Sequence, residues 1–187
     1  MKQKKKVKYV DNERFYQEII AYRKNLEEYR SSGRNEEPRM PDYIGECIWK
    51  IADRLSMKPC FVNYSYRDEM VSDGIENCIL YFKDYNPAIG QNPFAYFTQI
   101  IYYAFLRRIS KEEKNRYIIY KNFQETMTQL YESKDSEDGQ LISSTLYDNI
   151  HQFMRKFEKK EELKKEKRKN AKVGLQKFYE EDNGKRE

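Results

Sequence analysis

The sequence predicts an all-α fold on the basis of its composition and its hydrophobic periodicity. Seven glycines and five prolines are few for 187 residues, and residues that favour helices are abundant. Apolar side chains recur at steps of three and four residues, without a series of short alternating strands. With 39% hydrophobic residues and a mean hydropathy of −1.06, the chain is too polar to be packed throughout. We therefore expect a compact helical domain followed by a charged C-terminal extension that is helical or flexible.

The densest helical pattern lies between Glu69 and Ile109, where a turn separates two helices. Ser65 is expected to cap the first helix, which then begins near Tyr66. The stripe expected to face the core consists of Met70, Val71, Gly74, Ile75, Cys78, Ile79 and Phe82. The opposite, mostly acidic face consists of Glu69, Ser72, Asp73, Glu76 and Lys83. Such a face serves either solubility or the docking of a partner.

The second helix of this pair is expected to start at Asn92-Pro93, because Asn caps a helix and Pro suits its first position. Its core-facing residues are expected to be Phe97, Ile101, Ala104 and Phe105. Its other faces and its basic end carry Tyr96, Gln99, Tyr102, Tyr103, Arg107, Arg108, Lys111 and Lys114. Aromatic rings stack on unpaired bases and cations bind phosphates, so this helix is a candidate nucleic-acid surface.

Two further helices are expected before the central pair. The first runs from Glu13 to Tyr29 after a cap at Asp11 or Asn12, and its apolar side consists of Phe15, Ile19, Ile20, Tyr22, Leu26 and Tyr29. Asp42 is expected to cap the second, whose stripe consists of Ile44, Cys47, Ile48, Ile51, Ala52 and Leu55. The connection over residues 57–68 is expected to be buried without forming a strand.

Beyond the central pair, the helical pattern continues or restarts at Arg116 and is expected to end near Thr128. Residues 131–149 are rich in Ser, Asp, Gly and Glu, which is typical of a linker. The sequence thus predicts a helical domain at 1–130, this acidic linker, and a charged helix with a tail at 150–187. The stripe expected to dock the start of the charged helix consists of Ile150, Phe153, Met154 and Phe157.

The charged helix has ten basic and four acidic residues between Arg155 and Lys172. Pairs four residues apart, such as Glu161 with Lys165, are expected to stabilise it. Large apolar residues return only near the end, as Leu175, Phe178 and Tyr179. Because little before them is able to bury apolar surface, these three residues suggest that a partner supplies the burial.

The sequence offers little for catalysis. His151 is the single histidine, and no P-loop, HExxH or GxSxG motif occurs. Three cysteines without CxxC spacing favour neither zinc nor a disulfide framework. We therefore predict no enzyme, no catalytic residue, no metal and no cofactor. A net charge of +5 indicates a mixed surface, and no apolar run approaches the roughly 20 residues of a membrane span.

Three short motifs in the central pair match a known pattern in register and without a gap. They are Glu69-Met70-Val71-Ser72-Asp73-Gly74, the turn Asn86-Pro87 with Gly90, and Tyr96-Phe97-Thr98. They resemble region 2 of bacterial sigma factors. The sequence also contains three longer patterns. A KYxxN-like start consists of Lys8, Tyr9 and Asn12, an MxxDGIE-like run of Met70, Asp73, Gly74, Ile75 and Glu76, and an NPxAYxTQ pattern of Asn92, Pro93, Ala95, Tyr96, Thr98 and Gln99. These resemble the sigma-like late-transcription factors of T4-type bacteriophages more closely still.

The resemblance implies a transcription initiation factor that binds the core RNA polymerase of the bacterial host and directs it to short A/T-rich late promoters. Polymerase would be bound, through the coiled-coil clamp helices of one of its large catalytic subunits, by Glu69, Ser72, Asp73, Glu76 and Ile79. Promoter DNA would be bound by Tyr96, Gln99, Tyr102, Tyr103, Arg107, Arg108, Lys111 and Lys114. Tyr96 matches the family's base-stacking tyrosine, whereas Gln99 and Ile100 stand where primary sigma factors have tandem tryptophans.

The resemblance also implies a link to the phage sliding clamp, which holds a short C-terminal motif of the late factor. Leu175, Phe178 and Tyr179 resemble that motif. A late-transcription co-activator would be a further partner, no membrane is involved, and the chain would act in the cytoplasm of the infected host. Two alternatives from other classes are a general helical nucleic-acid-binding protein without a polymerase partner and a metal-dependent nuclease.

Overall fold

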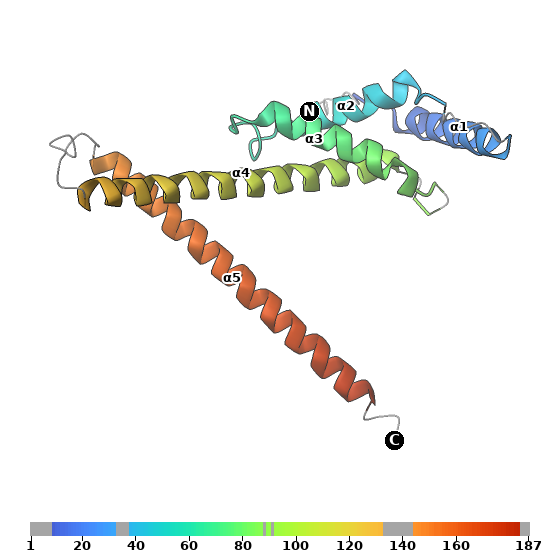
Figure 1. The fold of residues 1–187 in the computed structure, drawn as a ribbon. Helices are drawn as coiled ribbons and strands as arrows, with labels where there is room; N and C mark the ends of the chain where they lie inside the picture. The colour runs from blue at the N-terminus through green and yellow to red at the C-terminus, as the bar shows by residue number, and fades with distance from the viewer. Residues whose placement is uncertain (1–8, 33–37, 88, 91, 133–143, 184–187) are drawn as a thin grey trace, which may run out of the picture. The chain divides into compact units, whose positions relative to one another are not determined.

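A computed structural model of the protein describes residues 9–32, 38–87, 89–90, 92–132 and 144–183. The helices in these segments are α1 (Asn12–Ser31), α2 (Asp42–Ser56), α3 (Arg67–Leu80), the 3₁₀ helix η1 (Tyr81–Asp84), α4 (Pro93–Glu132) and α5 (Ser144–Asn183). No strand occurs among the described residues, so the all-α prediction is confirmed (Figure 1). The chain divides into two compact units, Met1–Ser110 and Lys111–Glu187.

The first unit has a core built from α1, α2, α3 and the first half of α4. All six residues of the predicted α2 stripe are buried, and Phe97, Ile101, Ala104 and Phe105 of α4 are buried as predicted. On α1 the prediction holds for Phe15, Ile19, Tyr22 and Leu26. It is wrong for Ile20, which is 37% exposed, because one helical step from Ile19 rotates a side chain by about 100°.

Phe97 is the centre of the aromatic packing. Its ring centroid lies 5.7 Å from that of Phe15 on α1, 5.9 Å from that of Phe82 on η1 and 5.9 Å from that of Tyr85. Phe97 is fully buried, and ring pairs at such distances add to the stability that burial provides. This residue therefore ties α4 to the beginning and to the middle of the unit.

Two asparagines and a proline define the start of α4. The Asn92 side chain accepts a hydrogen bond from the Ala95 backbone N–H at 3.0 Å, and Pro93 is the first helical residue, so the predicted start is confirmed. The Asn12 side chain, from the start of α1, accepts a second bond from the Phe94 N–H at 3.1 Å. The Tyr9 ring packs edge-on against Phe94. The N-terminal segment is thereby attached to the first turn of α4.

The other predicted caps are confirmed only in part. Asp11 caps α1, since its carboxylate accepts from the N–H groups of Glu13 and Arg14 at 3.1 and 3.3 Å. Asp42 does not cap α2: Pro41 is the N-cap, and the Asp42 carboxylate pairs instead with the Arg39 guanidinium.

The prediction that Ser65 caps α3 is also wrong. The N-cap is Tyr66, which makes no capping bond through its side chain, and the helix begins at Arg67. Ser65 therefore lies one position too early to reach the free N–H groups of the first turn. In the connection before it Phe61 is buried but Cys60 and Val62 are exposed, so the predicted burial holds only in part.

Helices α3 and α4 approach each other closely at Gly74. A Cβ atom on Gly74 would lie 3.0 Å from Ile101 Cγ2 and 3.1 Å from Phe105 Cε1. Met70, Gly74, Cys78 and Phe82 of the predicted stripe are buried, and Val71 and Ile75 are partly buried. Ile79 is 55% exposed, so its placement in the core stripe is wrong. Ile79 follows the buried Cys78 by one residue, and that step rotates its side chain by about 100° out of the stripe.

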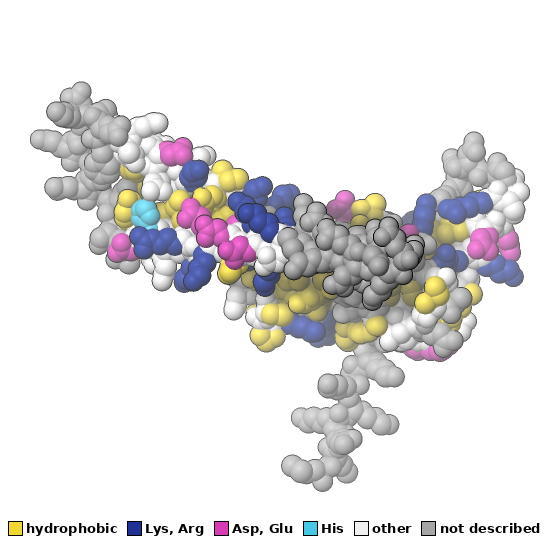
Figure 2. All heavy atoms as spheres, turned by 90° about the horizontal axis from the view of Figure 1, so that it is seen from below, with side chains coloured by type: hydrophobic (Ala, Val, Ile, Leu, Met, Phe, Trp, Pro, Cys, Tyr) yellow, Lys and Arg dark blue, Asp and Glu magenta, His cyan; other side chains and the backbone are white. Residues whose placement is uncertain are grey.

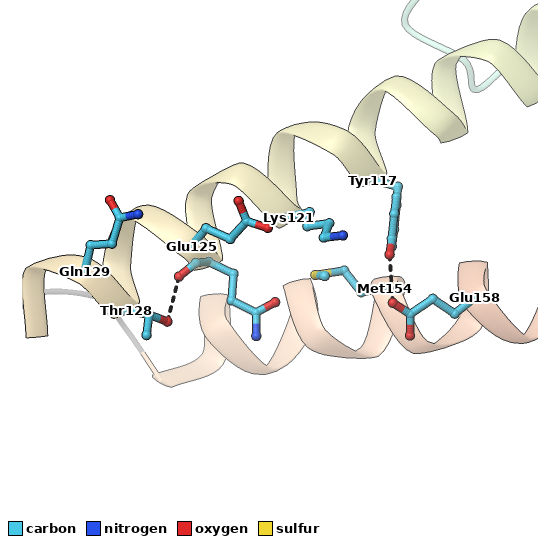
Figure 3. A pocket seen from close by; sticks show the side chains of 8 residues that line it. Tyr117, Lys121, Glu125, Thr128, Gln129, Met154 and Glu158 are labelled. Atoms are coloured by element: carbon cyan, nitrogen blue, oxygen red, sulfur yellow. Dashed lines mark hydrogen bonds between the residues drawn. The ribbon is translucent and has the colours of Figure 1, made fainter. Parts of the chain in front are cut away.

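The second unit contains the second half of α4 and all of α5. Ile150 and Met154 of α5 are buried, while the Phe157 ring stacks on Tyr117 at 4.7 Å and Phe153 packs against Tyr120 at 5.4 Å. The docking stripe of the charged helix is thus confirmed. Figure 3 shows Met154 and Glu158 projecting from α5 toward α4, with the Tyr117 hydroxyl donating to the Glu158 carboxylate at 2.8 Å.

Several predictions for this unit need correction. Helix α4 continues to Glu132, beyond the predicted end near Thr128, and α5 begins at Ser144 within the predicted linker. The first compact unit ends at Ser110, whereas the predicted domain ends at residue 130. The second half of α4 belongs to the second unit, where its tyrosines pack against rings of α5. Glu161 pairs with Lys164 at 2.6 Å, three residues away, and not with Lys165.

The close approach at Gly74 predicts opposite effects for two glycine-to-alanine substitutions. In a helix interior this change alone stabilises by about 0.5–1 kcal/mol. Gly45 of α2 faces open space, so Gly45→Ala should raise the free energy of unfolding by that amount. Gly74→Ala should lower it by about 1 kcal/mol, since the buried Ile101 and Phe105 must shift and overpacking costs about 1–3 kcal/mol. Equilibrium urea unfolding measures both, and equal stabilisation by the two variants would contradict the close approach.

Candidate functional site

The exposed side of the first half of α4 forms a shallow depression with the end of α2. Its volume is about 360 Å³, at the lower end of the range for small-ligand pockets. It is lined by Leu55, Lys58, Phe94, Ala95, Thr98, Gln99, Tyr102 and Tyr103. Most of these side chains are apolar or aromatic, and Lys58 supplies a cation. A flat, unpaired base with its phosphate is chemically suited to such a surface.

Three of the predicted DNA-binding residues, Gln99, Tyr102 and Tyr103, line this depression together. The two tyrosines are 42% and 51% exposed, and their rings meet at 5.8 Å in an edge-to-face arrangement. The buried Phe61 ring packs edge-on against the Tyr102 ring at 5.8 Å. These tyrosines are therefore positioned by packing while they remain accessible.

Sequence reasoning missed Leu55 and Lys58, which come from the end of α2 and the residues after it. Leu55 belongs to the stripe expected to be buried, and it is 5% exposed, so only its edge reaches the depression. Lys58 follows α2 in the connection, where a single lysine carries no periodic signal. Only the folded arrangement brings these residues next to Gln99 and the tyrosines.

Tyr96 differs from the other aromatic residues of α4 because it is partly buried and bonded within the fold. Its hydroxyl donates to the backbone carbonyl of Tyr81 at 3.2 Å, and its ring contacts Tyr85 at 5.0 Å and Phe97 at 5.2 Å. Burial raises the pKa of the Tyr96 hydroxyl, and the Asp84 carboxylate adds to the effect. Tyr96 therefore holds α4 to the start of η1 and is not among the residues that line the depression.

The two arginines of the predicted DNA surface are bonded to α3. Arg108 donates from Nε and Nη2 to the two carboxylate oxygens of Asp73, both at 2.6 Å, and Arg107 donates to Asn77 Oδ1 at 2.6 Å. Asp73 and Arg108, which the sequence assigned to two different partners, thus form one ion pair. Lys111 and Lys114 are exposed on the part of α4 that belongs to the second unit.

The predicted polymerase-binding residues mostly point to solvent. Glu69, Ser72, Glu76 and Ile79 are exposed on α3, and the Ser72 hydroxyl bonds only to the Asp68 carbonyl one turn earlier. Leu80 and Tyr81 next to them are 66% and 47% exposed. The outer side of α3 therefore combines separated carboxylates with accessible apolar side chains, which is typical of protein-binding surfaces.

The charge distribution is mixed at larger scale. On the face shown in Figure 2, Lys and Arg side chains are interspersed with acidic and apolar ones. The described residues gather no three His, Cys, Asp or Glu side chains at distances suited to a metal ion. Among them, no helix combines the length and apolar character that crossing a membrane requires.

The predicted clamp-binding residues Leu175, Phe178 and Tyr179 lie in the last turns of α5. Their side chains lie outside the described part of the structure. Comparison with known proteins adds no identification: no protein-family model matches this chain, and no curated protein matches it. The case for a function therefore depends on the residues themselves.

The Asp73–Arg108 pair predicts a measurable coupling. Both side chains are mostly buried, 27% and 19% exposed, and their contact is bidentate. A double-mutant cycle of Asp73→Asn and Arg108→Gln should give a coupling energy of at least about 1 kcal/mol, since solvent screens this pair less than a surface pair.

The matched control is the Arg39–Asp42 pair, whose side chains are 89% and 90% exposed and should couple by at most about 0.5 kcal/mol. Urea unfolding of the four proteins in each cycle supplies the values. Equal coupling in the two cycles would show that the Asp73–Arg108 contact is not formed as described.

Proposed function

We propose that the protein is a sigma-like transcription initiation factor that binds host core RNA polymerase and directs it to short A/T-rich late promoters. The observation that carries this proposal is that residues from two separate motifs of the resemblance lie together at the first turn of α4. Asn12 of the KYxxN-like start and Asn92 of the NPxAYxTQ pattern both bond the first turn of α4, while Tyr9 packs on Phe94. Gln99 of the same pattern lines the neighbouring depression. The motif residues thus support one shared surface.

In this proposal the outer side of α3 binds the coiled-coil clamp helices of polymerase. Glu69 and Glu76 would face basic residues of the partner, and Ile79 would be buried in the contact. Asp73 contributes less directly than the resemblance implies, because it already holds Arg108. Asp73 acts as a positioning residue, because its ion pair with Arg108 fixes α4 relative to α3.

The depression on α4 would receive unpaired bases of the promoter. Stacking of a base on an aromatic ring contributes about 1–3 kcal/mol, so Tyr102 and Tyr103 together supply a substantial part of the free energy needed to hold an extruded base. Lys58, Lys111 and Lys114 would contact phosphates, which adds affinity without sequence preference. The chain catalyses no reaction itself and contributes binding and positioning to the polymerase.

The C-terminal end of α5 would bind the phage sliding clamp through Leu175, Phe178 and Tyr179, with a late-transcription co-activator as a further partner. Tethering to a clamp on DNA raises the effective concentration of the factor at the promoter. A flexible or helical arm of this kind links two bound sites without a contact between them.

The first test concerns polymerase binding in the host cytoplasm or in a purified mixture. The variant Glu69→Lys with Glu76→Lys should weaken binding of core polymerase at least tenfold, since like charges would meet across the contact. The matched control reverses Glu27 and Glu28, which are exposed on α1 and change the net charge equally.

Circular dichroism and thermal unfolding establish that both variants are folded. Quantitative pull-down with core polymerase then measures the affinity. If the α3 variant and the α1 control bind polymerase as tightly as the parent chain, the outer side of α3 is not the docking face.

The second test concerns the tail. Removal of the residues after Lys172 should leave polymerase binding and basal initiation on A/T-rich templates unchanged, and it should abolish stimulation by a clamp loaded on the DNA. Single-round transcription with and without loaded clamp measures this. A truncated chain that responds to the clamp like the full chain would remove the tail from this role.

A further inference from the structure

Between Arg155 and Lys172, one side of α5 carries basic residues without acidic ones. Four basic residues follow one another at four-residue steps, and we call them the basic ladder: Lys156, Lys160, Lys164 and Arg168. Three acidic residues are spaced in the same way and form the acidic ladder: Glu158, Glu162 and Glu166. At about 100° per residue, the four acidic residues between positions 155 and 172 lie within roughly 140° of arc, which they share with Arg155, Lys165 and Lys169. The basic ladder runs along the remaining surface, where no acidic residue of this segment lies.

This arrangement is unfavourable for an isolated helix. Like charges four residues apart repel each other, whereas opposite charges at that spacing stabilise a helix. Every step of the basic ladder and every step of the acidic ladder joins like charges. A pattern that served only to keep a solvated helix folded would alternate the signs. The unbroken row of cations on one side of α5 therefore indicates that the basic ladder has a binding role.

The charges around Glu161 indicate a positive electrostatic potential along the basic ladder. The hydrogen bond from Lys164, with the charges of Lys164, Arg168 and Lys160, lowers the pKa of the Glu161 carboxyl. Lys160 also pairs with Glu113 of α4 within the second unit. These ion pairs are substantially exposed, and such pairs contribute little and exchange readily with other anions. The ladder is therefore available to a polyanion.

The length and regularity of the basic ladder favour a polyanion that presents a regular row of charges. Consecutive members of the ladder are about 6 Å apart along the helix, and the ladder extends over about 18 Å. Duplex DNA presents a regular row of phosphates along each strand, with one charge per about 3.4 Å of axis. Flexible lysines act as point charges for phosphate and impose no base preference.

We propose that the basic ladder of α5 binds the phosphate backbone of duplex DNA without regard to sequence. This site is separate from the depression on α4 and does not require polymerase. It gives the chain a second, electrostatic contact with DNA, which keeps the factor near the template between binding events. The proposal holds or fails independently of the sigma-like function.

The test measures binding of the full-length chain to a labelled G/C-rich duplex by fluorescence anisotropy at several salt concentrations. The ladder variant carries Lys156→Gln, Lys164→Gln and Arg168→Gln, and it keeps the Lys160–Glu113 pair. The matched control carries Arg155→Gln, Lys165→Gln and Lys169→Gln, which removes the same charge elsewhere on α5. Circular dichroism compares their helix content.

Each phosphate contact contributes about 0.9 to the slope of log affinity against log salt. The ladder variant should therefore lower that slope by about 2 to 3, and the control by less than about 1. Equal losses in the two variants would show an effect of net charge alone, and an unchanged slope in the ladder variant would exclude the site. Either result overturns the proposal.

Two further measurements sharpen the assignment. Glu161→Gln removes the carboxylate beside the ladder and should tighten DNA binding several-fold, whereas Glu166→Gln on the acidic ladder should not. Polyglutamate at equal charge concentration should displace the chain from DNA poorly. Equally effective displacement would point to an acidic protein as the occupant and contradict the proposal. Core polymerase binding of the ladder variant should equal that of the parent, which separates this test from the sigma-like function.

Discussion

The close contact of α3 with α4 is the constraint on which the first unit depends. It is possible because Gly74 has no side chain: a Cβ atom there would lie 3.0 Å from Ile101 and 3.1 Å from Phe105 of α4, closer than ordinary van der Waals contact. Hydrogen bonds lie on both sides of this point, from Arg107 and Arg108 to α3 at one end and from Tyr96 to the Tyr81 carbonyl at the other. The pairing fixes two exposed surfaces at once, the outer side of α3 and the tyrosine side of α4.

This pairing also changes how the charged residues are assigned. The resemblance to sigma factors gives Asp73 to a protein partner and Arg108 to DNA. The structure joins Asp73 and Arg108 in a bidentate contact between mostly buried side chains, which stabilises the fold and leaves both groups less available to an external partner. The proposed partners are left with side chains that stay exposed: Glu69, Glu76 and Ile79 on α3, Lys58, Gln99 and the two tyrosines around the depression, and Lys111 and Lys114 further along α4.

The sequence predicted local features best, such as helix caps and the buried side of a helix, which depend on residues within one or two turns. The Asn92-Pro93 start of α4, the Asp11 cap and the α2 stripe follow from local rules, and all three are confirmed. Contacts between residues far apart in the sequence could not be predicted, since nothing in the order of residues links Asp73 to Arg108 or Lys58 to Gln99. The caps at Asp42 and Ser65 failed because each residue lies one position away from the N-cap, which is Pro41 in α2 and Tyr66 in α3, and neither N-cap makes a capping bond through its side chain.

The central claim is that the tyrosine side of α4 holds unpaired promoter bases once polymerase is bound. Permanganate reactivity of thymines in an A/T-rich template, with core polymerase and the chain together, measures this directly. The account predicts reactive thymines with the parent chain and with Tyr147→Ala, a control at a similarly exposed tyrosine of α5, and a strong loss with Tyr103→Ala although polymerase is still bound. Thymines that react equally with Tyr103→Ala, or that stay unreactive with the parent chain on polymerase, would contradict it.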